Sequence, residues 1–193
     1  MNEAERQEFN RFKEQLEEVT DDVLPIVNDI TVHTRRARGA MGGLTENEDG
    51  EIVDKLVDTL VLSNEQVELA ILLQRIGDRI STIGYITRGM EEFYKRVMEG
   101  HKVRLTRVGV EKTKQVKDPD STTGFRTETV YETVAAGVAD SMKIELAHEA
   151  FVLFNECQKR MDMLINIRKS TDKTIDTVRS KLSYEKRNED SAR

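Results

Sequence analysis

The sequence predicts a mainly α protein, an elongated antiparallel helical bundle or coiled coil with a β-hairpin inserted between two long helices. In three segments apolar residues recur at alternating spacings of four and three, which keeps one apolar seam of a helix facing its partner. After Gly100 the pattern changes to strand-like alternation and then returns to the helical spacing. Apolar residues make up 37% of the chain and charged residues 34%, which is typical of helices that bury a narrow stripe.

Residues 1–37 are predicted to form an amphipathic helix whose seam is Phe9, Phe12, Leu16, Val19, Val23, Ile26 and Ile30. Because an internal proline removes a helical hydrogen bond, we expect Pro25 to cause a kink or break near residues 22–24. Residues 38–50 contain four glycines with Asn47 and Asp49, and this composition predicts a Gly-rich loop.

Residues 51–101 are predicted to form a long helix, and Thr45 with Glu48 has the capping-box spacing expected at its start. Its apolar phase slips at residues 63–66, where Val53, Leu56, Leu60 and Val67 give way to the register beginning at Leu69; we favour one continuous helix over a break. The seam comprises Leu69, Leu73, Ile76, Ile80, Ile83, Met90, Tyr94 and Val97. Ile71, Leu72, Ile86 and Phe93 lie beside it, so this face should contact more than one neighbour.

Residues 102–131 alternate apolar and polar side chains around a turn-forming stretch, and we expect a basic β-hairpin with a bulge beside Gly109. Residues 132–186 again show helical spacing, followed by a frayed tail over 187–193. The seam of this last helix includes Phe154, Met161, Leu164, Ile175 and Val178, and it is interrupted by the polar residues Arg168 and Thr171. The two long helices should run antiparallel, with the N-terminal helix as a third helix of the bundle.

Charge is unevenly distributed along a chain of net charge −6. Residues 102–127 carry seven basic and three acidic side chains, and residues 159–193 carry ten and six. The hairpin cations are candidate contacts for nucleic-acid phosphates or an acidic protein surface, although lysines on an edge strand can also simply discourage strand pairing. These residues are Lys102, Arg104, Arg107, Lys112, Lys114, Lys117 and Arg126.

No catalytic motif is evident, and we expect a non-enzyme without metal or cofactor. Glu145 and His148 have the spacing of a helical metal-ligand pair, but no second pair accompanies them, which favours a solvated polar face. The single cysteine, Cys157, lies on the apolar repeat and is interpreted as a buried core thiol.

Phosphate binding is a weaker interpretation of two Gly-containing stretches. Arg35, Arg36 and Arg38 precede the Gly-rich loop, where backbone amides beside basic side chains could cradle a phosphate. Neither this loop nor residues 84–90 match the phosphate-binding loop pattern, so a flexible linker is the favoured interpretation of the loop.

The leading functional hypothesis is a structural or assembly protein that works through self-association and protein contacts, including contacts at the hairpin tip, as a component of a larger particle such as a viral one. One alternative is a nucleic-acid accessory protein that uses the basic hairpin and C-terminal tail; another is a helical-bundle metalloenzyme. The order of two long helices around a hairpin also resembles prefoldin subunits in layout, which implies a chaperone. We expect no membrane contact and a cytoplasmic location, or one in an intracellularly assembled particle.

Overall fold

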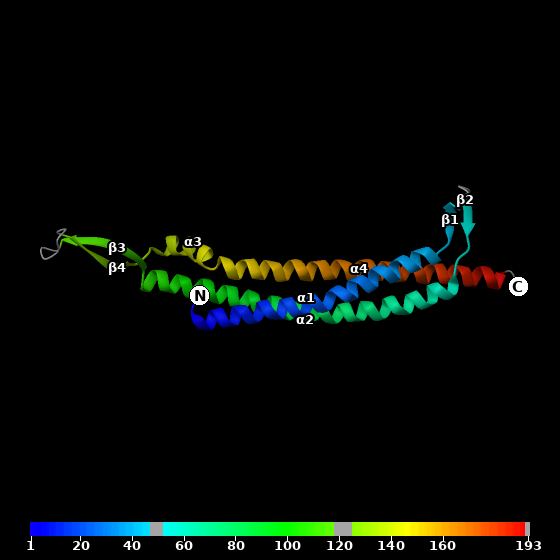
Figure 1. Cartoon of the computed structure of the whole chain (residues 1–193), viewed down its shortest axis with the longest axis horizontal. Coiled ribbons are helices and arrows are strands. Elements are labelled where there is room, and N and C mark those ends of the chain that lie inside the picture. The colour runs from blue at the N-terminus through cyan, green and yellow to red at the C-terminus, as the bar shows by residue number, and fades with distance from the viewer. Residues whose placement is uncertain (47–51, 118–124, 192–193) are drawn as a thin grey trace. The chain divides into compact units, whose positions relative to one another are not determined.

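The computed structural model describes residues 1–46, 52–117 and 125–191 (Figure 1). Its elements in chain order are α1 (Glu3–Ala40), β1 (Gly43–Glu46), β2 (Ile52–Lys55), α2 (Thr59–Arg107), β3 (Val110–Lys117), β4 (Phe125–Glu132), α3 (Ala136–Leu146) and α4 (His148–Ser191). The predicted fold class is confirmed: the described chain is mainly helical, and an antiparallel hairpin separates α2 from α3 and α4.

The chain divides into two compact units. The first unit comprises Met1–Lys13 and Thr87–Glu156, and the second comprises Glu14–Ile86 and Cys157–Arg193.

In the second unit three helical segments pack around an apolar core. Asp22 on α1 pairs with Arg79 on α2 at 3.1 Å, and His33 pairs with Glu65 at 2.5 Å, so these two helices run antiparallel. Gly84 and Gly77 on α2 lie against Met161 and Arg168 on α4, which makes this pair antiparallel as well. The core at one end combines residues from all three helices: Ala37, Ala40, Leu62, Leu69, Ile175 and Val178.

In the first unit aromatic side chains fill the space between helices. Phe93 on α2 is 1% exposed, and its ring centroid lies 6.4 Å from that of Phe9 and 6.0 Å from that of Phe12. Tyr94 contacts Phe151 and Phe154 of α4, with centroids 5.5 and 6.3 Å away. The predicted seam of α1 therefore packs in both units: Phe9 and Phe12 in the first, and the residues from Leu16 to Ile30 in the second.

Helix α1 is capped at its start and continuous through its proline. The Glu5 amide donates to Asn2 Oδ1 at 2.8 Å, and the Asn2 amide donates to Glu5 Oε2 at 2.7 Å, which is a reciprocal capping box. The helix has no break near residues 22–24, because Val23 and Ile26 on either side of Pro25 are both buried and hold the segment in place.

The boundaries predicted for the Gly-rich loop and the second helix were wrong. Helix α1 continues to Ala40 and ends before Gly42 and Gly43, whose φ angles of 74° and 111° suit glycine. Thr45 pairs with Val53 across a short antiparallel hairpin, so Thr45 is not a helix cap. Helix α2 begins at Thr59, where Asp58 Oδ1 accepts a hydrogen bond from the Val61 amide at 3.0 Å.

The start predicted for the hairpin over residues 102–131 was also wrong. Helix α2 continues to Arg107, because His101 and Leu105 extend the four-residue spacing that begins at Val97 and Leu105 is 5% exposed. Gly109 has a φ of +95° and follows the helix end; its amide donates to the Arg104 carbonyl at 3.0 Å. The expected bulge beside Gly109 is thus a helix terminus.

The segment predicted as one helix over 132–186 is two helices. Helix α3 ends at Leu146, a turn at Ala147 follows, and α4 begins at His148. Helix α4 continues to Ser191, so the described part of the predicted frayed tail is helical.

The glycines of α2 offer a matched pair of substitutions. Gly84→Ala is expected to raise the free energy of unfolding by about 0.5–1 kcal/mol, because alanine is the better helix former. Its Cβ would meet Met161 Sδ at an ordinary 3.9 Å. Gly89→Ala should gain less or destabilise, because its Cβ would lie 2.7 Å from Phe12 Cε1. Urea unfolding followed by circular dichroism measures both, and equal stabilisation would contradict this packing.

Candidate interaction surfaces

The predicted seam residues lie in the interior of the two units. Eight are buried (Leu69, Ile76, Ile83, Met90, Val97, Leu164, Ile175 and Val178), and Leu73, Ile80, Tyr94, Phe154 and Met161 are half-buried. Thr171 is 2% exposed and donates its hydroxyl to the Ile167 carbonyl at 2.9 Å, which satisfies it within its own helix. Because these side chains pack inside one chain, the seam leaves little apolar surface for a second copy.

A second apolar stripe lies on the opposite face of α2. We define the outer stripe as Leu60, Val67, Ile71 and Tyr85, which are 73%, 58%, 50% and 76% exposed. At 3.6 residues per turn these four positions fall within an arc of about 40°. Leu69 and Ile76, in the buried seam, lie on the other side of the helix. In the second unit α2 is therefore apolar on two faces, one covered by α1 and α4 and one open.

The outer stripe explains the phase slip in the sequence. Leu60 and Val67 belong to a register different from that of Leu69, and α2 is continuous through both. Ile71 and Tyr85 extend the first register along the outer face. The two registers occupy two faces of one helix, so the phase slip requires no break in α2.

The hairpin is less basic than the sequence suggested. Lys102, Arg104 and Arg107 lie on α2, and only Lys112, Lys114, Lys117 and Arg126 lie on β3 and β4. From Val110 to Glu132 the sequence has four basic and five acidic side chains. Lys112 pairs with Glu132, and Arg126 pairs with Glu128. The hairpin tip at 118–124, predicted to contact other proteins, lies outside the described residues.

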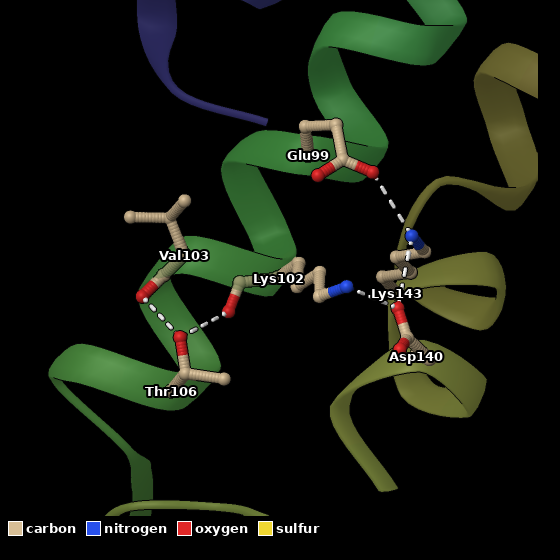
Figure 2. Close-up of polar contacts among 6 residues, drawn as sticks. All are labelled: Glu99, Lys102, Val103, Thr106, Asp140 and Lys143. Carbon is tan, nitrogen blue, oxygen red and sulfur yellow. Dashed lines mark hydrogen bonds and ion pairs between the residues drawn. The ribbon is translucent and has the colours of Figure 1, made fainter. Parts of the chain in front are cut away.

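An ion-pair network joins α2 to α3 (Figure 2). Lys143 Nζ lies 3.0 Å from Glu99 Oε1 and 3.0 Å from Asp140 Oδ1, and Lys102 Nζ lies 2.9 Å from the same Asp140 oxygen. Hydrogen bonds from Lys102 and Lys143 lower the pKa of Asp140, and those to Glu99 and Asp140 raise the pKa of Lys143. Lys102, predicted as a partner contact, is thus engaged within the chain and positions α3.

Two further polar groups lie near the hairpin. A hydrogen bond and the charge of Lys112 lower the pKa of Glu132. Burial lowers the pKa of His101, as do the positive charges of the Met1 amino group and Arg104, while Glu5 opposes them. The buried His101 Nε2 has no hydrogen-bond partner among the described residues, which fits an imidazole held neutral.

The buried pair of His33 and Glu65 was not predicted from the sequence. Glu65 is 7% exposed, and its Oε2 lies 2.5 Å from His33 Nδ1 across α1 and α2. The missed signal is that Glu65 lies between Leu62 and Leu69 on the inward face of α2. A carboxylate at such a position needs a polar partner from a facing helix.

Glu145 and His148, whose spacing the sequence analysis interpreted as a solvated polar face, do not lie on one helix. Glu145 lies near the end of α3 and His148 begins α4, so the helical i, i+3 geometry is interrupted by the turn at Ala147. Within residues 1–46, 52–117 and 125–191 no group of three or more His, Cys, Asp or Glu side chains is arranged to hold a metal ion. Cys157 is buried with 0% exposure.

No helix in the described part of the chain has the length and apolar composition needed to cross a membrane. No family model, curated protein or solved structure matches the chain.

Proposed function

We propose that this protein is a non-enzymatic assembly protein that self-associates through the outer stripe of α2. The observation that carries the proposal is the stripe itself: Leu60, Val67, Ile71 and Tyr85 are at least half exposed on one face of a helix whose other face is buried. An apolar stripe repeated at heptad spacing is the pattern that a second helix packs against.

Polar residues within the outer stripe favour self-association with one register and one oligomer number. Asn64, Gln74, Asp78 and Ser81 occupy the same face at the intervening heptad positions, and all are exposed. Polar side chains at seam positions lower stability and restrict register and oligomer number. Apolar burial at four positions with polar spacers fits a modest interface between copies of this chain.

Light scattering coupled to gel filtration at micromolar concentration tests this proposal. The wild-type chain is expected to elute as a dimer or larger oligomer. The double variant Val67→Lys with Ile71→Lys should elute as a monomer, because two ammonium groups would be desolvated in the contact.

The matched control is Leu24→Lys with Val32→Lys on α1, where the side chains are 57% and 44% exposed but off the stripe. This control should keep the wild-type mass. A wild-type monomer, or loss of association in both double variants with unchanged circular dichroism, would sink the proposal.

A further inference from the structure

A groove lined by cationic, hydroxyl and apolar side chains lies between α1 and α4 in the second unit. Two adjoining depressions of about 270 and 290 Å³ form it, and they share Arg38 and Ser170. Val27, Ile30 and Ile167 contribute apolar walls to the first depression. The groove therefore has a defined shape made by two packed helices.

The described walls of the groove carry three positive charges and no negative charge. Arg35 and Arg38 line the first depression, and Arg38 and Lys173 line the second. Among residues 1–46, 52–117 and 125–191, no carboxylate lines either depression. Within the described residues these three cations form no ion pair. In a chain of net charge −6, such a cluster is a local excess.

Two hydroxyl groups in the groove are available to donate. Thr31, Thr171, Thr174 and Thr177 each donate to a carbonyl four residues earlier in their own helix. Thr34 and Ser170 donate no hydrogen bond among residues that the structure describes, and both line the first depression. The groups that remain free are thus guanidinium, ammonium and hydroxyl donors.

We propose that the groove binds a small ligand bearing two or three phosphate groups. Guanidinium forks match phosphate oxygens in bidentate geometry, and lysine adds a point charge. Two depressions that share Arg38 and Ser170 suit neighbouring phosphates, with Arg38 between them. No aromatic side chain among the described residues lines either depression, so the phosphates and not a stacked base carry the recognition.

Isothermal titration of the full chain with tripolyphosphate, at constant ionic strength, tests this site. Arg38→Gln should weaken binding by about tenfold or more, because it removes charged hydrogen bonds to two phosphates. The control is Arg36→Gln, which removes the same charge from an exposed position that lines neither depression. It should bind like the wild type.

Three results would overturn the proposal: no binding by the wild type, equal weakening in both arginine variants, or binding of a single-stranded oligonucleotide but not of tripolyphosphate. The variant Val67→Lys with Ile71→Lys should retain tripolyphosphate binding. The proposal for the groove and the proposal for the outer stripe can therefore be disproved independently.

Discussion

Phe93→Ala is expected to lower the free energy of unfolding by about 3–5 kcal/mol, since it removes a fully buried ring and leaves a cavity. Phe93 is 1% exposed and contacts Phe9 and Phe12 across the first unit. Urea unfolding monitored by circular dichroism measures the loss.

Phe125→Ala on β4 is the control for Phe93, because its ring is 47% exposed. It should change stability by no more than about 0.5 kcal/mol. Similar losses for Phe93 and Phe125 would mean that the aromatic cluster is not a core.

Gly109→Ala is expected to destabilise the β3–β4 hairpin by about 2 kcal/mol or more. The residue has a φ of +95°, and an added Cβ would lie 2.5 Å from the backbone carbonyl carbon and oxygen of Glu132. Backbone atoms cannot give way as a flexible side chain can. The substitution should therefore displace the end of β4 from the end of α2, where the Val134 amide donates to the Leu105 carbonyl at 3.1 Å.

Amide hydrogen exchange across β3 and β4 measures this local opening. Gly100→Ala is the matched control, because it lies in α2 with no atom within 4 Å of its added Cβ. It should leave exchange in the hairpin unchanged. Full protection of the hairpin in Gly109→Ala would contradict the close approach to Glu132.

The heptad spacing predicted the helices and most of their buried residues because burial repeats with the period of the helix. It could not assign every turn. Val103 and Leu105 alternate with polar residues and suggested a strand, yet Leu105 also continues the four-residue spacing from Val97 and His101. The pattern therefore fits both a strand and a continued helix up to Gly109, whose left-handed φ marks the end of the helix. The β1–β2 hairpin was not predicted, because Ile52 and Val53 fit a short helical pattern equally well.

The interaction surfaces were harder to predict than the fold. Leu60 and Val67 are apolar in sequence, but whether an apolar face is covered depends on where α1 and α4 lie. The α1–α4 groove likewise joins Arg35 and Arg38 to Ser170 and Lys173, residues more than a hundred positions apart. In the sequence the two arginines precede a predicted loop, whereas Ser170 and Lys173 belong to α4, which runs parallel to α1.

The concentration dependence of the thermal unfolding midpoint tests the central claim most directly: one chain folds its own core and associates through the outer stripe. Association of folded chains raises the midpoint as concentration rises. The wild-type midpoint should increase with concentration, while Val67→Lys with Ile71→Lys should stay helical with a constant midpoint. A variant that is unfolded as a monomer, or a wild-type midpoint independent of concentration, would contradict the claim.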